Sequence, residues 1–514
     1  MINLSAMDMG LSIGFFAIFA LFGSFDYSVI FTLSPYMNET AISIISLLIF
    51  MGAMAKSAQL GLHSWLPGSM EAPTPVSALL HAATLVTAGL YLLVRSSPIL
   101  EYSSTALLII TLIGASTAFF AATCGLVLND IKRIIAFSTI SQLGYMVMAV
   151  GLSQYNVALM HVVNHAFFKA LLFLGAGAII HSTADQQDIR RLGGLINLLP
   201  FTYSAMLIGT IALLGLPWLS GFYSKDLIIE LAYSKYSFSS NYAYILGSIT
   251  AGLTSFYSFR LISLVFLTVP NANKNTYLNT HEANLAVIIP LSILSLFSIF
   301  FGFVLSDLFV GIGTDFFGNS LFIHPNNISL VEAEFSLPLL IKLLPTILSI
   351  IGGSFAIFIY HNKASGTEIL TEWLAGGARG GSSQGFAHPS AATDHPSNFF
   401  RQIYRFLNGQ YFFDIIYNHY IINKGLKFGY TISKVLDRGI IEIVGPFGLS
   451  NVLQNTGFKL AKLDTGVITT YSLYITLGLL SLVFLVFSPI LFDNYLLNEM
   501  RLLIIYISSL FLIL

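Results

Sequence analysis

Long apolar segments follow one another along most of this chain, and they constrain its fold more than any other feature. A helix that crosses a bilayer needs about 20 mostly apolar residues, and segments of this kind recur from residue 9 to residue 360. The predicted spans are 9–25, 41–66, 74–96, 103–128, 131–152, 156–182, 200–232, 243–269, 285–306 and 338–360. We therefore expect an all-α polytopic membrane protein.

Composition supports this fold class and excludes several others. Of 514 residues only 23 are Lys or Arg and 24 are Asp or Glu, 9% in all, whereas soluble domains carry roughly 25% charged residues. A formal net charge of -1 argues against a nucleic-acid-binding protein, which needs a basic surface. The single cysteine, Cys124, excludes a disulfide framework, a Cys-based zinc site and a cysteine-ligated iron–sulfur cluster within the chain. We expect no metal and no cofactor in this chain.

The last part of the sequence departs from the pattern of spans. Residues 361–409 are rich in Gly, Ser and Pro, which predicts a loop or linker. From 410 to 465 apolar residues recur at three- and four-residue spacing among charged ones, as in a long amphipathic helix on an apolar surface. Gly445-Pro446 should interrupt this helix, because proline removes a backbone donor. Residues 471–514 are expected to form a C-terminal transmembrane anchor.

If successive spans alternate in direction, the charged loops sort onto two sides of the membrane. One side collects Lys132, Arg133, Arg190, Arg191 and Lys274. The other side holds Lys235 and the acidic residues Asp26, Glu39, Glu101, Asp307, Glu332 and Glu334. Because basic loops face the cytoplasm or the matrix, the first set marks the inner side.

Several basic side chains fall inside the predicted spans, where a charge costs a few kcal/mol and asks for a reason. Lys56 and Lys225 lie in spans that Gly and Pro interrupt. His161, His165 and Lys169 are four residues apart, so they follow one slowly turning stripe of a helix. Burial disfavours the charged form of a lysine, which lets such a side chain take and give a proton. We interpret these five residues as proton carriers.

The remaining bases within or beside the spans have structural roles as alternatives. His81, in a further span, is as consistent with a hydrogen-bonded core group as with a proton carrier. Basic residues near span ends are expected to reach the membrane interface, and these are His63, Arg95, Lys132, Arg133 and Arg260.

The two interrupted spans resemble each other in sequence. LGLHSWLP follows Lys56, and the similar LGLPWLSG precedes Lys225. Broken helices at matching positions of two halves point to an ion path. The pairing predicts inverted repeats of five helices, in which 103–269 is a complete repeat, 1–96 is a partial first repeat and 285–360 adds further helices.

The segments around the buried bases resemble a known family. KSAQLGLHSWLPGSMEAPTPVSALLHAATLVTAGLYLL, NDIKRIIAFSTISQLGYM, HVVNHAFFKALLFLGAG and GLPWLSGFYSKDLIIE are similar to the antiporter-like chain 5 family of NADH:ubiquinone oxidoreductase, respiratory complex I. The large subunits of multisubunit sodium/proton antiporters share the Lys and His motifs. YFFDIIYNHYI and LDRGIIEIVGPFGLS resemble the start of the lateral helix of the complex I family, which favours complex I.

The resemblance implies a proton-translocating membrane-arm subunit of an H+-translocating NADH:ubiquinone reductase, with no redox catalysis in this chain. Flavin, iron–sulfur clusters and ubiquinone would then belong to other subunits. It makes Lys56 the lysine of a first half-channel, His81 its connector and Lys225 the terminal lysine toward the outer side. The implied central hydrophilic axis comprises His161, His165 and Lys169. Three acidic residues also match family positions, Asp226 and, with less certain roles, Asp8 and Asp130.

The resemblance also implies partners and a location. The family has further spans before the position of Asp8, including one whose glutamate pairs with the lysine at position 56, so Lys56 should lack a carboxylate partner within this chain. We expect these helices on a separate chain packed against 9–25 and 41–66, besides other membrane-arm subunits and lipids. The expected location is the mitochondrial inner membrane, with a bacterial plasma membrane as the alternative. A subunit of a sodium/proton antiporter and a purely structural arm subunit remain open as other functions.

Overall fold

A computed structural model describes residues 2–361 and 397–491. The chain divides into two compact units, Met1–Phe413 and Asp414–Leu514. Helices dominate the described residues of both units, and the only strand-like pairing among them is one isolated bridge between Asp130 and Asp188. The expectation of an all-α membrane protein is confirmed.

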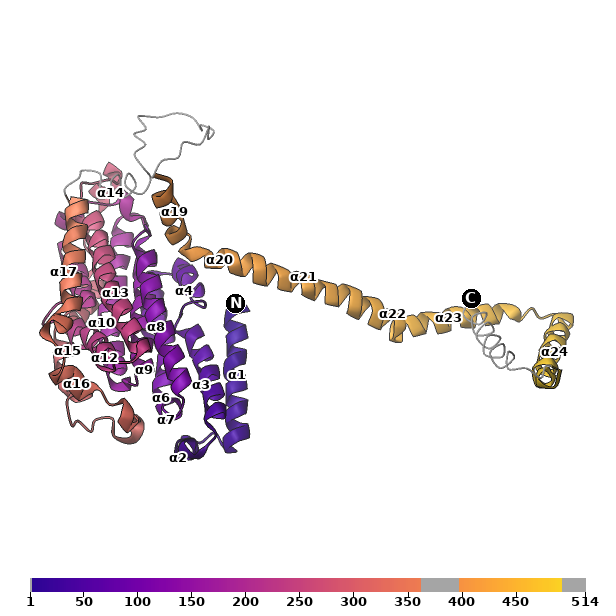
Figure 1. The fold of residues 1–514 in the computed structure, drawn as a ribbon. Helices are drawn as coiled ribbons and strands as arrows, with labels where there is room; N and C mark the ends of the chain where they lie inside the picture. Colours follow the sequence, from indigo (N-terminus) through magenta and orange to yellow (C-terminus); the bar gives the residue numbers. More distant parts are fainter. Residues whose placement is uncertain (1, 362–396, 492–514) are drawn as a thin grey trace. The chain divides into compact units, whose positions relative to one another are not determined.

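Within the described ranges, eight helices are long and apolar enough to cross a membrane. They are α3 (Glu39–Lys56), the continuous helix Thr74–Arg95, α8 (Ser104–Gly125), α9 (Ile131–Gly151), α10 (Tyr155–Ser182), the helix Phe238–Leu267 that begins with α13 (Phe238–Ile262), α15 (Leu285–Val310) and α17 (Leu339–His361) (Figure 1). Each overlaps a predicted span.

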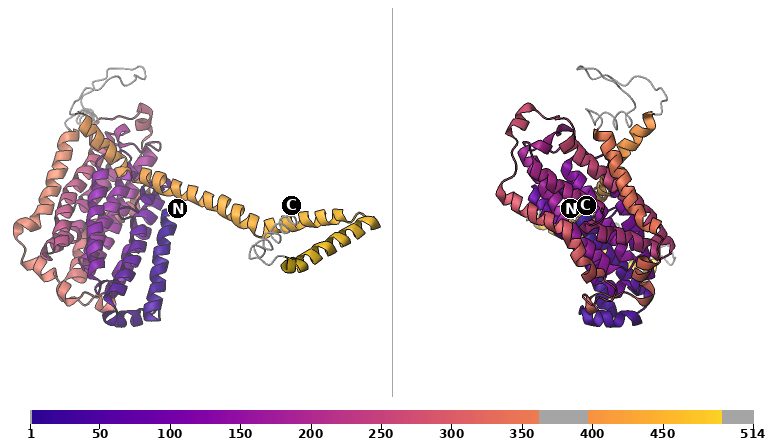
Figure 2. Two further views of the ribbon diagram at one scale, coloured as in Figure 1. Left: turned by 45° about the vertical axis from the view of Figure 1, so that its right-hand side comes forward. Right: turned by 90° about the vertical axis from the view of Figure 1, so that its left-hand side faces the viewer.

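α1 (Ile2–Phe22) corresponds to the first predicted span, but the sequence did not reveal the short helix that follows it. α2 (Tyr27–Leu33) and the turn after it bend by 68° from α1. Figures 1 and 2 show α1 at one edge of the bundle and α15 and α17 at the opposite edge.

The helix observed in the predicted span 41–66 is shorter than that span. α3 ends at Lys56, and the chain resumes a helix only at α4 (Trp65–Gly68). Between them Ala58 has φ +49° and Gly61 has φ +90°, backbone conformations that a right-handed helix excludes. The indole N–H of Trp65 donates to the carbonyl of Ala55 at 2.9 Å, which satisfies one of the carbonyls that the break frees.

The predicted interruption of the span 200–232 is confirmed. α11 (Pro200–Leu214) ends at Gly215, which has φ +80°. After a short loop the chain continues as the π-helical segment η6 (Phe222–Asp226) and then as α12 (Leu227–Ser234). A broken helix at membrane depth is tolerated only where protein or a water-filled cavity satisfies the freed backbone groups.

α9 lies in the centre of the bundle, with every residue of its apolar window buried. Small residues bring it close to α8: a Cβ on Gly114 would lie 2.5 Å from the amide nitrogen of Met148, and one on Gly144 would lie 2.6 Å from that of Ala118. Such close approach is how helices associate tightly in lipid. The face of α9 that carries the polar residues is thereby fixed in place.

The ends of the bundle carry the charges that the loops predicted. α14 (Lys274–Asn279) lies at the basic end, and α16 (Leu330–Phe335), which contains Glu332 and Glu334, lies at the acidic end (Figure 1). The basic end is therefore assigned to the inner side of the membrane.

The predicted loop 361–409 is helical in its last part, because α19 (Ser397–Asn408) forms within it. Its FFRQIYRFL segment repeats apolar residues at three- and four-residue spacing, a pattern that favours an amphipathic helix. Residues 362–396, which hold most of the predicted loop, lie outside the described residues.

The second unit, taken by itself, is a long run of helix followed by a turn. Its elements are α20 (Phe413–Ile416), η11 (Tyr417–Ile422), α21 (Asn423–Thr431), η12 (Ile432–Ile441), α22 (Glu442–Val444), α23 (Pro446–Leu463) and α24 (Ile468–Leu491). Gly445 has non-helical φ/ψ, so the interruption predicted at Gly445-Pro446 is present. α24 bends away by 116° and covers the predicted span of the anchor, while 492–514 lie outside the described residues.

Candidate functional site

α10 carries a column of buried bases. His161, His165 and Lys169 are at most 1% exposed, and the imidazole rings of the two histidines lie 6.3 Å apart between centroids. The ammonium of Lys169 donates a hydrogen bond to the hydroxyl of Ser138 on α9. The four-residue spacing thus brings the three predicted carriers onto one buried stripe.

His161 connects this column to the break between α11 and α12. Its Nδ1 lies 2.8 Å from Oγ of Ser224, and its Nε2 lies 3.1 Å from Oε1 of Gln142 on α9. The side-chain amide of Asn164 also donates to Ser224, at 3.3 Å. Ser224 immediately precedes Lys225, so the hydrogen bonds run from α10 into the broken span.

Lys225 is fully buried at the break and is held by neutral oxygen atoms. Its Nζ donates to Oγ1 of Thr254 on α13 at 3.1 Å and to the backbone carbonyl of Leu214, the last residue of α11, at 3.3 Å. It also lies 5.6 Å from the centroid of the Tyr145 ring, within the range of a cation–π contact. A buried cation needs such compensation, and the broken helix supplies a free carbonyl for it.

Several buried polar atoms near the bases of α10 and near Lys225 have no hydrogen-bond partner within residues 2–361 and 397–491. They are both ring nitrogens of His165, Nε2 of Gln142, Oδ1 of Asn164 and Oδ2 of Asp226. Buried polar groups are almost always paired with protein or with ordered water. Ordered water is the expected partner of each of these atoms.

Lys56 and Asp8 form an ion pair at the edge of the bundle. Nζ of Lys56, the last residue of α3, lies 3.5 Å from Oδ1 of Asp8 on α1, and the side chains are 39% and 57% exposed. The expectation that Lys56 has no carboxylate partner in this chain is wrong, because α1 packs against α3 and brings Asp8 to it.

His81 is almost fully buried, at 9% exposure. It belongs to the π-helical segment η3 (Ser77–Thr84), which packs against α10. Its ring centroid is 6.0 Å from that of Trp65, and its Nδ1 has no partner among the described residues. π-helical segments are rare and occur often at functional sites.

Asp130 lies at the N-terminal end of α9. Its carboxylate caps α9 by accepting from the backbone N–H of Lys132 at 3.0 Å, and it lies 3.7 Å from Nε of Arg133. Its backbone pairs with that of Asp188. These contacts join two loops of the basic end.

The expected interface anchoring is wrong for three bases. His63 is fully buried, with its ring 4.6 Å from that of Phe120. Arg260 is 6% exposed and donates to the carbonyl of Leu128 at 2.6 Å, and Lys132, 5% exposed, donates to the carbonyl of Ala72 at 3.3 Å. The two cations donate to backbone carbonyls of loops inside the protein. These carbonyls replace the water molecules that would hydrate the charges at a membrane interface.

Sequence reasoning missed the uncharged polar residues that contact the predicted carriers. Ser138, Gln142 and Tyr145 occupy positions i, i+4 and i+7 of α9, so they share one face. A search for Ser, Thr, Asn and Gln at helical spacing within apolar spans would have found this face. Ser224 and Thr254 carry no such periodic signal, because they lie in different spans.

Comparisons with known proteins identify the family. The family model "NADH:quinone oxidoreductase/Mrp antiporter, TM" matches residues 2–254, and "NADH dehydrogenase subunit 5 C-terminus" matches residues 385–487. NADH-ubiquinone oxidoreductase chain 5 of Schizophyllum commune is 64% identical over 503 residues, 98% of this chain and 70% of that one. This chain belongs to the NADH-ubiquinone oxidoreductase chain 5 family. Chain 5 of Marchantia polymorpha is 44% identical over 92% of this chain and 69% of its own length.

Two solved structures share the fold at lower identity. The Mrp complex from Dietzia sp. DQ12-45-1b matches with a TM-score of 0.53 and 22% identity over 94% of this chain and 45% of that one. The membrane-bound sulfane sulfur reductase, an archaeal respiratory membrane complex, gives a TM-score of 0.52 and 24% identity over 59% and 61%. At these identities the match establishes the antiporter-like fold and nothing finer.

Membership of the chain 5 family makes this chain a membrane subunit of an NADH-ubiquinone oxidoreductase. Together with its fungal and plant relatives, it is a multi-pass protein of the mitochondrial inner membrane. Within the part of the chain that the structure describes, no group of three or more His, Cys, Asp or Glu side chains is arranged to hold a metal ion.

Proposed function

We propose that this chain translocates protons across the inner membrane along a row of Lys and His side chains, driven by electron transfer from NADH to ubiquinone in other subunits. The row runs through Lys56, His81, Lys169, His165, His161, Lys225 and Asp226. The observation that carries the proposal is the hydrogen bond between Nδ1 of His161 and the hydroxyl of Ser224, the residue that directly precedes Lys225. This bond brings a buried base of α10 to the broken span that holds Lys225, while Lys225 itself donates to Thr254 and to the carbonyl of Leu214.

The tautomer of His161 follows from its partners. Oε1 of Gln142 can only accept, so Nε2 of His161 carries the proton and donates to it. Nδ1 then accepts from the hydroxyl of Ser224. Taking up a second proton at Nδ1 requires this hydroxyl to turn away, and that makes Ser224 a switch point between α10 and the segment of Lys225.

The half-exposed pair of Lys56 and Asp8 supports a partner at the edge of the bundle. An ion pair that faced lipid would lose the hydration of both charges, so we propose that helices from outside the described residues cover α1 and α3 there. Other subunits would hold the flavin, iron–sulfur and ubiquinone sites, and the exposed amphipathic helix of the second unit would bind neighbouring membrane-arm subunits.

The decisive experiment removes the charge of a carrier while keeping its length. Lys169→Met and Lys225→Met should abolish most proton pumping by energised inner-membrane vesicles, with the subunit still assembled on a native gel. Lys274→Met, which changes an exposed lysine of the basic end, is the control and should pump normally. Normal pumping in both carrier variants would refute the proposal, and transport that requires sodium but not NADH would favour an antiporter.

A further inference from the structure

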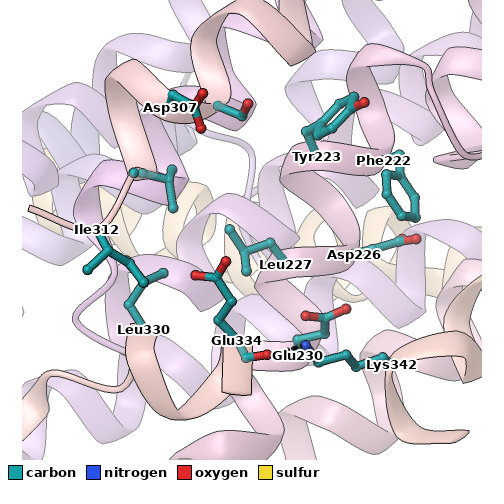
Figure 3. Close-up of a pocket in the computed structure, with 13 residues that line it drawn as sticks. Phe222, Tyr223, Asp226, Leu227, Glu230, Asp307, Ile312, Leu330, Glu334 and Lys342 are labelled. Atoms are coloured by element: carbon teal, nitrogen blue, oxygen red, sulfur yellow. Dashed lines mark hydrogen bonds between the residues drawn. The ribbon is translucent and has the colours of Figure 1, made fainter. Parts of the chain in front are cut away.

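A pocket of about 420 Å³ lies at the acidic side of the bundle, beside the buried end of the row. η6 and α12 form one wall, and α15, α16 and α17 complete it. Figure 3 shows the carboxylates of Asp226, Glu230, Asp307 and Glu334 around it, with the side chain of Lys342 reaching toward Glu230. Four carboxylates and one lysine, all titratable side chains, thus line the pocket.

Asp226 connects the row to this pocket. It follows Lys225 directly in η6, is 3% exposed, and lines the pocket. Its Oδ2 is buried without a hydrogen-bond partner in the described structure. Because a buried carboxylate oxygen needs a donor, and a polar pocket of this size holds many water molecules, we expect water in the pocket to hydrogen-bond this atom.

Burial decreases stepwise from Asp226 to the rim. Glu230 lies one turn further along the same helix and is half-buried. Asp307 on α15 and Glu334 on α16 are exposed. Lys342 is held across the pocket by donating from Nζ to the backbone carbonyl of Glu334 at 2.6 Å. The exposure of these carboxylates therefore increases from Asp226, through Glu230, to Asp307 and Glu334 at the outer surface.

We propose that this pocket is a hydrated exit vestibule, in which Glu230 accepts the proton that Asp226 releases and Lys342 acts as a positioning residue. The O–H bond of the Asp226 carboxyl breaks, the proton passes through pocket water, and an O–H bond forms on Glu230. Glu230 then releases it to water at the rim, and Lys225 reprotonates Asp226. One proton moves outward, and no electron donor or acceptor is needed. The proposal rests on the proposed function for the source of this proton.

Access to the pocket is tested by single-cysteine labelling. The chain has one native cysteine, Cys124, which is buried, so the background is low. Leu227→Cys lines the pocket, whereas Ile228→Cys, one residue on, is fully buried away from it. A charged, membrane-impermeant thiosulfonate applied to mitoplasts from the outer side should modify Leu227→Cys and leave Ile228→Cys unmodified. Equal rates at the two positions, or modification only from the matrix side, would overturn the vestibule.

The role of Glu230 is tested by the variant Glu230→Gln in the assembled complex. A positioned proton carrier contributes about 100-fold or more to a transfer step, so pumping should fall at least roughly tenfold while the subunit stays assembled. Glu332→Gln, an exposed carboxylate of α16 that does not line the pocket, should pump normally. Lys342→Met should displace the pH profile of pumping, and Lys342→Arg should restore it.

The outcomes separate this inference from the proposed function. If Lys225→Met pumps normally, the proposed function fails, whatever the labelling shows. If Lys225→Met stops pumping but Glu230→Gln pumps like the unmodified complex, the row stands and the vestibule is refuted.

Discussion

Replacing Gly144 with alanine should destabilise the centre of the bundle. A Cβ at this position would lie 2.6 Å from the amide nitrogen of Ala118 and 2.8 Å from the carbonyl oxygen of Gly114, whereas ordinary van der Waals contact begins at 3.4 Å. Both atoms are backbone, so no side chain can turn aside. α8 and α9 must separate by several tenths of an ångström.

The magnitude follows from two opposing terms. Overpacking a dense interior costs about 1–3 kcal/mol, and rigid backbone neighbours favour the upper end. Alanine also gains about 1 kcal/mol over glycine in a helix interior. We therefore expect Gly144→Ala to lose about 2 kcal/mol, which is more than tenfold in an equilibrium constant.

Gly247→Ala is the matched control. This glycine is buried in α13, but its Cβ would meet its nearest neighbours, side-chain atoms of Ile229 and Tyr145, at 3.5 Å. It should be neutral or slightly stabilising, because only the helix term remains. The midpoint of heat inactivation of the assembled complex should fall for Gly144→Ala and not for Gly247→Ala. Equal midpoints would refute the close packing of α8 on α9.

Three further outcomes can be checked in the same complex. Ser224→Ala removes the hydroxyl that bonds His161 and leaves a buried nitrogen unpaired, at about 1–3 kcal/mol; pumping should fall, and unchanged pumping would exclude the switch at this hydroxyl. Burial raises the pKa of Asp188, but hydrogen bonds and charge from Arg190 outweigh it, so the pKa lies below its ordinary value of 3.8. This pair stabilises the loop above pH 4 and is lost as the pH falls through that lowered pKa, so Asp188→Asn should lower the inactivation midpoint at pH 7 and make no difference at strongly acid pH. Glu101→Gln should open the loop 311–329 to protease, because its carboxylate accepts two hydrogen bonds from that loop, at 3.0 and 2.8 Å.

The spans could be predicted because their signal is local. In lipid every backbone group must be satisfied within its own helix, so an apolar segment of sufficient length specifies a helix with little regard to its neighbours. Gly215 and Pro217 predicted the break before Lys225 for the same local reason. The end of α3 at Lys56 was harder, because the turn depends on Ala58, which has no sequence preference for positive φ.

The side of each helix that is buried in the protein could not be predicted with the same success. Lipid and protein interior are both apolar, so hydrophobic periodicity does not tell which side of a membrane helix is buried. α9 is buried on all sides, and α15 exposes most of its apolar residues, yet both are simply apolar in sequence. His63 was misjudged for this reason.

The sequence by itself determined the membrane fold and the stripe of His161, His165 and Lys169, since these follow from segment length and helical spacing, and its loop charges predict the sidedness. Only the tertiary structure decided the partners of the charged groups. Asp8 reaches Lys56, and Ser138 reaches Lys169, because separate helices pack together. A charge at membrane depth is stabilised by the side chains, carbonyls and water molecules that surround it. Which of these groups lie close enough depends on how the helices of the bundle pack.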